Sequence, residues 1–289
     1  MTEPAWWTVW VLDAPSVAAL VGIGALYLHG ETLRRRQTGV NRRGRVAAFA
    51  AGWLVALLSV VSPVAGLAGD LLWVHMVQHL LMTVVAAPLL ALGAPQATIR
   101  RALTPGARHA LARLVRRASL RRRSWAPPPV MVAAAVHAAA LWVWHAPALY
   151  DLAATNAAVH LLEHVVFVGT AVWFWSAVVA TTRRDRRQHA LATLSLGGLI
   201  AQGGVLGALM TFAPRSVYAA YDGARGLTAL QDQQVAGTLM WVPPGFIYAI
   251  VGIALFIRWF DLVERDARRR AAGAHARRDD LASGLVHRD

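Results

Sequence analysis

Cysteine and lysine are both absent from this chain of 289 residues. Without cysteine the protein has no disulfide, no Fe–S cluster and no thiolate metal site. Any metal site must therefore use histidine, methionine, carboxylate or carbonyl ligands. Because lysine is absent, all 29 basic residues are arginine, and with 15 acidic residues they give a net charge of +14.

Charge is scarce within long stretches of the chain, and hydrophobic residues make up 57% of it. This composition, with a mean hydropathy of +0.44, is typical of a multi-pass membrane protein rather than a soluble domain. A charge of +14 would suggest a nucleic-acid partner for a soluble protein. Here the arginines fall in short clusters between apolar segments, as membrane orientation requires, so we expect no nucleic-acid partner.

Seven apolar segments are each long enough to cross a bilayer as a helix. They lie near residues 12–30, 46–66, 71–92, 128–146, 157–180, 190–213 and 231–258. The sequence thus predicts an all-α fold with one domain, a seven-helix transmembrane bundle over residues 1–263. The basic tail, residues 264–289, has few large apolar residues and is expected to be disordered in the cytoplasm.

Arginine-rich and arginine-free connections alternate along the chain. Residues 31–45 contain six arginines, 93–127 contain nine and 181–189 contain four, whereas 63–70 and 146–156 contain none. With the tail included, 27 of the 29 arginines fall on one side of the membrane, which the positive-inside rule makes cytoplasmic. We therefore expect the N-terminus outside and the C-terminus in the cytoplasm.

The longest connection, residues 93–127, contains a helix-start signal at Thr104 and Pro105, an N-cap followed by proline at the first helical position. Leucine, valine and alanine then alternate with arginine, as in an amphipathic helix that lies on anionic lipids of the inner leaflet. A solvated basic linker is the alternative interpretation.

Histidines concentrate in the outer halves of the third, fourth and fifth segments, where ionisable side chains are costly and by default mark function. Helical rise sorts them into an outer tier and an inner tier, the latter roughly 12–13 Å below the outer boundary. The outer tier contains His75, His160 and His145. The inner tier contains His79, His137 and His164, with Met240 nearby and Asp232 at the mouth of the last segment.

The third and fifth segments share the pattern V-H-x-x-[Q/E]-H, at residues 74–79 and 159–164. Residues four apart lie on one face of a helix, so each segment presents a histidine pair. Gln78 and Glu163 are candidates for accepting a hydrogen bond from a metal-binding imidazole and so orienting its ring. Two such pairs and His137 at matched depth favour a metal or haem site over interhelical packing.

Other interpretations of these residues remain open. Met240 is equally suited to packing, and Asp232 to capping the last helix. His160, Glu163 and His164 form H-x-x-E-H, the inverted zincin signature. A membrane zinc hydrolase would use both histidines as ligands and Glu163 as general base.

Several short motifs resemble the seven-span cytochrome c oxidase assembly factor family, CtaG, of the kind found with Gram-positive oxidases. They are H-M-V-Q-H at 75–79, L-G-A-P at 92–95, H-A-P-A-L-Y-D at 145–151, H-L-L-E-H at 160–164, D-Q-Q at 232–234 and M-W-V-P at 240–243. The resemblance covers roughly residues 45–260 and implies a bacterial plasma-membrane protein that assembles a haem–copper oxidase.

The resemblance further implies copper supply to the buried site of the oxidase catalytic subunit, without enzymatic turnover. Neutral imidazole suits copper in either oxidation state, and thioether suits Cu(I). The expected partners are an oxidase subunit and an extracytoplasmic copper donor. A zinc hydrolase and a haem-binding electron-transfer protein are the alternatives.

Overall fold

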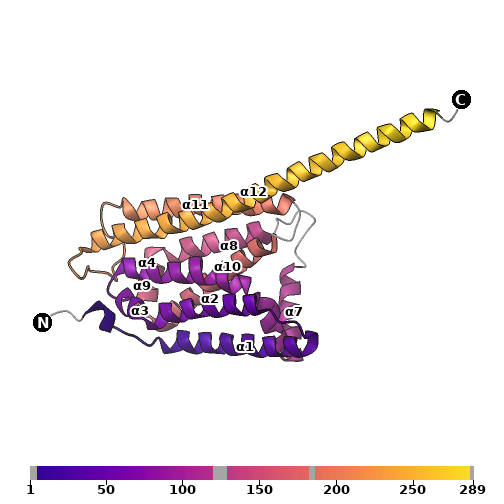
Figure 1. The fold of residues 1–289 in the computed structure, drawn as a ribbon. Coiled ribbons are helices and arrows are strands. Elements are labelled where there is room, and N and C mark those ends of the chain that lie inside the picture. Colours follow the sequence, from indigo (N-terminus) through magenta and orange to yellow (C-terminus); the bar gives the residue numbers. More distant parts are fainter. Residues whose placement is uncertain (1–4, 120–128, 182–185, 287–289) are drawn as a thin grey trace.

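The computed structural model describes residues 5–119, 129–181 and 186–286. Within these residues every regular element is a helix (Figure 1), which confirms the all-α prediction. Parts of two predicted cytoplasmic connections, residues 120–128 and 182–185, lie outside the described residues.

The long helices follow the predicted apolar segments. They are α1 (Ala14–Thr38), α2 (Arg43–Val61), the third segment as α4 (Leu72–Leu80), η2 (Leu81–Ala86) and α5 (Ala87–Leu92), then α8 (Pro129–Trp144), α10 (Ala157–Thr181), α11 (Arg186–Thr211) and α12 (Ala229–Val286). Shorter elements connect them: η1 (Trp6–Thr8), α3 (Pro63–Ala68), α6 (Pro95–Ala102), α7 (Pro105–Ser119) and α9 (Pro147–Thr155).

Six helical segments of the described chain are long and apolar enough to cross a membrane. A seventh span is obtained if α8 and α9, which are bent by 76° at their junction, are counted together. Helix α8 has only 16 residues, about 24 Å at 1.5 Å per residue, which is short for a hydrocarbon core of about 30 Å. The chain is therefore a multi-pass membrane protein with six or seven candidate spans.

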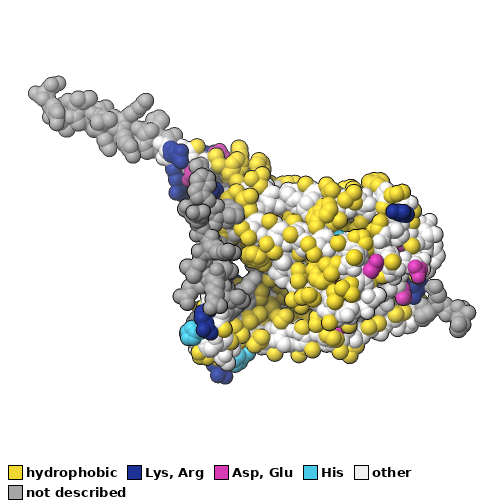
Figure 2. All heavy atoms as spheres, turned by 180° about the vertical axis from the view of Figure 1, so that it is seen from behind, with side chains coloured by type: hydrophobic (Ala, Val, Ile, Leu, Met, Phe, Trp, Pro, Cys, Tyr) yellow, Lys and Arg dark blue, Asp and Glu magenta, His cyan; other side chains and the backbone are white. Residues whose placement is uncertain are grey.

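Hydrophobic side chains cover the middle of the bundle, and charged side chains lie toward its two ends (Figure 2). Exposed large apolar residues such as Leu54, Val165, Leu194 and Ile250 come from four of the long helices. Such a surface is stable against lipid and would be an aggregation liability in water.

The two ends of the bundle differ. Helices α3 and α9 lie at the end nearest the N-terminus, and α7 lies at the opposite end (Figure 1). Helix α7 begins at Pro105 as predicted, with Thr104 Oγ1 accepting a hydrogen bond from the Ala107 amide at 3.3 Å. Its described arginines Arg108 and Arg113 are exposed.

Helix α12 continues past residue 263 into the predicted tail, as far as Val286. Arg265 donates to Asp261 at 2.7 Å, and Arg268 pairs with Glu264. These pairs are four residues apart, a spacing that stabilises exposed helices.

The third span contains a feature that the sequence did not predict. Residues 81–86 form the π-helix η2 directly after His79. π-Helical turns occur mostly as short insertions in α-helices and frequently at functional sites. Trp175 Nε1 of α10 donates to the Thr83 carbonyl at 3.2 Å, which satisfies one backbone acceptor within the irregular turn.

One glycine of α11 allows close packing against α12, at one end of the helix. A Cβ on Gly207 would lie 2.4 Å from Trp241 Cδ1 of α12, so only glycine allows this approach. Four other glycines of α11 have no atom within 4 Å of an added Cβ: Gly197, Gly198, Gly203 and Gly204.

Candidate metal centre

Four histidines from α4 and α10 form one cluster at the α3 and α9 end of the bundle. The ring centroids of His75 and His79 are 4.3 Å apart, and those of His160 and His164 are 4.2 Å apart. Across the two helices His75 lies 5.6 Å from His160, and His79 lies 5.4 Å from His164. The two i, i+4 pairs therefore face each other.

Glu163 lies among these rings without a compensating partner. Its side chain is 1% exposed, and neither carboxylate oxygen has a hydrogen bond. The nearer oxygen lies 4.0 Å from His79 Nε2. An unpaired carboxylate inside a protein is costly, and a metal cation between Glu163 and the imidazoles would offset that cost.

Two overlapping groups of side chains bring their ligand atoms within 4.8 Å of one another. One consists of His75, His160 and Glu163, and the other of Asp13, His160 and His164. Ligands about 2.0–2.1 Å from one ion lie at most about 4.2 Å apart. Side-chain shifts below about 1 Å would bring either group onto a metal ion.

Tyr221, in the connection between α11 and α12, orients one of these imidazoles. Its hydroxyl donates to the Ala68 carbonyl at 3.0 Å and lies 3.2 Å from His75 Nδ1. Because the single hydroxyl proton is directed at Ala68, His75 Nδ1–H donates to the Tyr221 oxygen. His75 Nε2 then carries a lone pair, and it is buried without a partner, as a metal ligand requires.

His145 shows the same arrangement at the end of α8. Its Nδ1–H donates to the Leu141 carbonyl at 2.7 Å, while Nε2 is buried without a partner. Its ring centroid lies 6.2 Å from that of Tyr150 and 6.1 Å from that of Phe167. His145 therefore lies beside the four-histidine cluster, and its Nε2 is available to bind a ligand.

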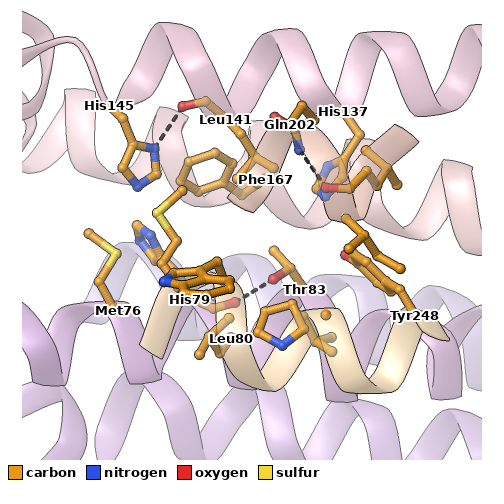
Figure 3. Close-up of a pocket in the computed structure, with 18 residues that line it drawn as sticks. Met76, His79, Leu80, Thr83, His137, Leu141, His145, Phe167, Gln202 and Tyr248 are labelled. Atoms are coloured by element: carbon orange, nitrogen blue, oxygen red, sulfur yellow. Dashed lines mark hydrogen bonds between the residues drawn. The ribbon is translucent and has the colours of Figure 1, made fainter. Parts of the chain in front are cut away.

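A pocket adjoins the cluster on the side of His79 (Figure 3). His79, His145 and Met76 lie at one end, and His137 and Tyr248 at the other. The walls between them are mainly apolar, and thioether and imidazole groups are their main metal-binding donors.

The structure does not bring His137 to the other histidines of the predicted inner tier. Its Nδ1–H donates to Thr170 Oγ1 at 2.9 Å, since that hydroxyl itself donates to the Val166 carbonyl. Its ring lies parallel to Phe174, 6.5 Å away between centroids. Helical rise fixes the depth of a residue but not the direction of its side chain, and His137 reaches the pocket from α8 instead.

A family model described as cytochrome c oxidase caa3 assembly factor matches residues 25–261. The chain belongs to this family. No curated protein and no solved structure matches the chain. The match includes the helices of all four clustered histidines and identifies the protein as an assembly factor for caa3 cytochrome c oxidase, which agrees with a role other than enzymatic turnover.

Asp232 was predicted to lie at a metal site, and in this caa3 assembly factor it has a structural role as a helix cap. Its two carboxylate oxygens accept the amides of Leu72 and Trp73 at 2.8 and 2.9 Å. These amides belong to the first turn of α4, where backbone donors lack intrahelical partners. Asp232, which is 0% exposed, thus caps the helix that carries His75 and His79, rather than its own helix α12.

The position of Met240 is compatible with both predicted roles, packing and a place beside the metal site. It packs with Met76, Met210 and Tyr150 in a buried cluster, and it also lines the pocket beside His79. Its carbonyl lacks the usual helical donor because residue 244 is proline. Met240 therefore borders the caa3 assembly factor's pocket without joining either three-residue ligand group.

The connection between α11 and α12 covers the cluster, and no periodic pattern in the sequence predicted this. Asp151 accepts the amides of Ala219 and Ala220 at 3.3 and 3.0 Å, and Tyr218 donates to the His145 carbonyl at 3.1 Å. Burial raises the pKa of Tyr218 and Tyr221, which keeps both phenols protonated as donors. These contacts close the caa3 assembly factor's histidine cluster at the α3 and α9 end of the bundle.

Proposed function

We propose that this caa3 assembly factor binds copper between α4 and α10 and delivers it to the oxidase catalytic subunit. The proposed ligands come from five side chains, His75, His79, His160, His164 and Glu163, of which His75, His160 and Glu163 form one compact group. The observation that carries the proposal is the set of buried, unpartnered nitrogen and oxygen atoms that these side chains direct toward one another. Buried polar groups normally have partners, and a metal ion supplies one for all of them.

Copper fits this donor set better than the two alternatives. Neutral imidazoles suit copper in both oxidation states, and the thioethers of Met76 and Met240 in the adjoining pocket suit Cu(I). Haem fits less well, because the space that a porphyrin needs beside one histidine pair is filled by the other pair. Zinc fits the nitrogen and oxygen ligands but not the thioether-lined pocket.

The proposed orientation places the centre near the outer face of the membrane. The cluster lies at the α3 and α9 end of the bundle, opposite α7. The positive-inside rule places arginine-rich α6 and α7 in the cytoplasm, where exposed Arg108 and Arg113 would meet anionic lipids. Copper would then come from an extracytoplasmic donor and leave through the pocket toward the oxidase.

Cysteine labelling tests this orientation. The chain has no native cysteine, so only the introduced residue can react. Thr155 ends α9 and Ala107 lies in α7, and both are exposed. We expect Thr155→Cys to react with a membrane-impermeant maleimide in intact cells, and Ala107→Cys to react only after the cells are opened. Labelling of Ala107→Cys in intact cells, with Thr155→Cys protected, would reverse the topology and the copper route.

Glu163→Gln separates metal binding from hydrolysis. As a ligand, Glu163 contributes charge and an oxygen, so we expect the purified variant to bind copper about tenfold more weakly and oxidase yield to fall accordingly. Elemental analysis of parent and variant measures the metal, and a visible spectrum of each shows whether a haem Soret band is present.

Added copper provides the control for this substitution. A binding defect is overcome at higher copper concentration, and oxidase yield then recovers. A hydrolase that has lost its general base does not recover, although it retains its metal. Oxidase yield that stays at the deletion level in excess copper, with metal content unchanged, would refute the copper-delivery proposal.

A further inference from the structure

Asp13 lies next to the histidine cluster although it precedes the residues that match the family, 25–261. It is the N-cap residue of α1, where its carboxylate accepts the Ser16 amide at a long 3.5 Å. Its carboxylate also lies within 4.8 Å of the ligand atoms of His160 and His164. The capping bond engages the carboxylate only weakly and leaves oxygen lone pairs for a second partner.

Close packing fixes the segment that carries Asp13. A Cβ on Gly66 of α3 would lie 2.2 Å from the Val9 carbonyl, so the chain before α1 runs directly against α3. Further along, Trp53 Nε1 of α2 donates to the Leu20 carbonyl of α1 at 2.8 Å. Asp13 is therefore held over the cluster by two neighbouring helices.

His164 supplies an independent sign that this position receives a ligand. The residue is 5% exposed, and neither of its ring nitrogens has a hydrogen-bond partner. Asp13 and His160 are only half-buried. The group of Asp13, His160 and His164 therefore combines a deep, unsatisfied imidazole with a half-buried carboxylate and a half-buried residue, His160, whose Nε2 is also without a partner.

We propose that Asp13, His160 and His164 form an outer loading site for a hydrated divalent copper ion, from which the ion passes to His75 and Glu163. This inference rests on the proposed copper function and adds a step to it. His160 belongs to both ligand groups, so it remains bound while the ion changes its other ligands.

The transfer is an exchange of coordination bonds. Bonds from the ion to Asp13 and His164 break while bonds to Glu163 and His75 form, with no change in oxidation state. One carboxylate replaces another and one neutral imidazole replaces another, so the charge around the ion is unchanged. Only the degree of burial differs, because His75 and Glu163 are buried while Asp13 is half-buried. The ion therefore loses its remaining water as it moves inward.

Asp13→Asn tests the loading site while it retains a good helix cap, since asparagine and aspartate are equally favoured at that position. We expect the purified variant to take up added Cu(II) about tenfold more slowly or worse in stopped-flow experiments. The final copper content should match the parent, because His75, His160 and Glu163 are unchanged. The Cu(II) EPR spectrum trapped early in loading should also lose the parent's carboxylate-bound species.

Asp70→Asn is the matched control, because Asp70 is an exposed acid that directly follows α3, at the same end of the bundle. It should load copper at the parental rate, and the melting temperature of apo Asp13→Asn should equal the parent's. Parental loading kinetics and EPR in Asp13→Asn would overturn the loading site. Absence of copper binding by the parent itself would instead overturn the proposed function.

Discussion

His160→Ala is expected to weaken copper binding more than any other single histidine substitution, by about 100-fold or more. His160 is the one residue common to both ligand groups, so the variant loses a bond at the loading site and another at the inner site. Competition with a chelator of known copper affinity measures the loss. The yield of spectroscopically intact oxidase in cells should fall with it.

His109→Ala provides the control, because His109 is exposed on α7 at the opposite end of the bundle. His189 is unsuitable as a control, because it is 2% exposed within α11. His137→Ala should have a smaller effect than His160→Ala, since His137 borders only the pocket. Parental copper affinity in His160→Ala would exclude the proposed centre.

Asp232→Ala is expected to cause the largest loss of stability, about 2–4 kcal/mol. The substitution leaves the Leu72 and Trp73 amides without acceptors in a buried site. The first turn of α4 then loosens, and His75 and His79 lose their fixed positions. Thermal unfolding of the detergent-solubilised apoprotein measures the effect.

The apoprotein is essential in this experiment because it separates a helix cap from a metal ligand. A cap contributes to stability without metal, whereas a ligand contributes only when metal is bound. Asp232→Asn should retain part of the stability, since its amide oxygen can accept one of the two amides. Asp222→Ala, an exposed acid in the preceding connection, should unfold like the parent. An unchanged apoprotein melting temperature in Asp232→Ala would restore Asp232 to the list of candidate ligands.

The helices and the main histidine pairs could be predicted because they depend on local periodicity. Long apolar stretches specify spans, and a spacing of four residues specifies a common helix face. His75 and His79 therefore had to lie together, as did His160 and His164. The two pairs face each other if α4 and α10 both turn these faces toward the inside of the bundle. This arrangement is favoured because exposing imidazoles to lipid is costly.

The remaining parts of the site depend on contacts between residues far apart in sequence. Tyr221 and His75 are 146 residues apart, and Asp232 and Leu72 are 160 apart. Neither spacing leaves a pattern in one sequence. Helical rise predicted a common depth for His137, His79 and His164, whereas in the structure His137 lies at the opposite end of the pocket from His79 and pairs with Thr170. Asp13 resembled an ordinary helix cap, which it also is.

The π-helical segment η2 has a consequence for the geometry of the third span. Each residue of an α-helix turns the chain by about 100°, and a π turn accommodates one residue more than an α turn. The half that carries His75 and His79 is therefore rotated relative to the half that carries Leu90. Removing a single residue from 81–86 would change the phase between the two halves without shortening the span appreciably. One inserted residue thus sets the angle, measured about the helix axis, between the face that carries His75 and His79 and the faces at the opposite end of the span.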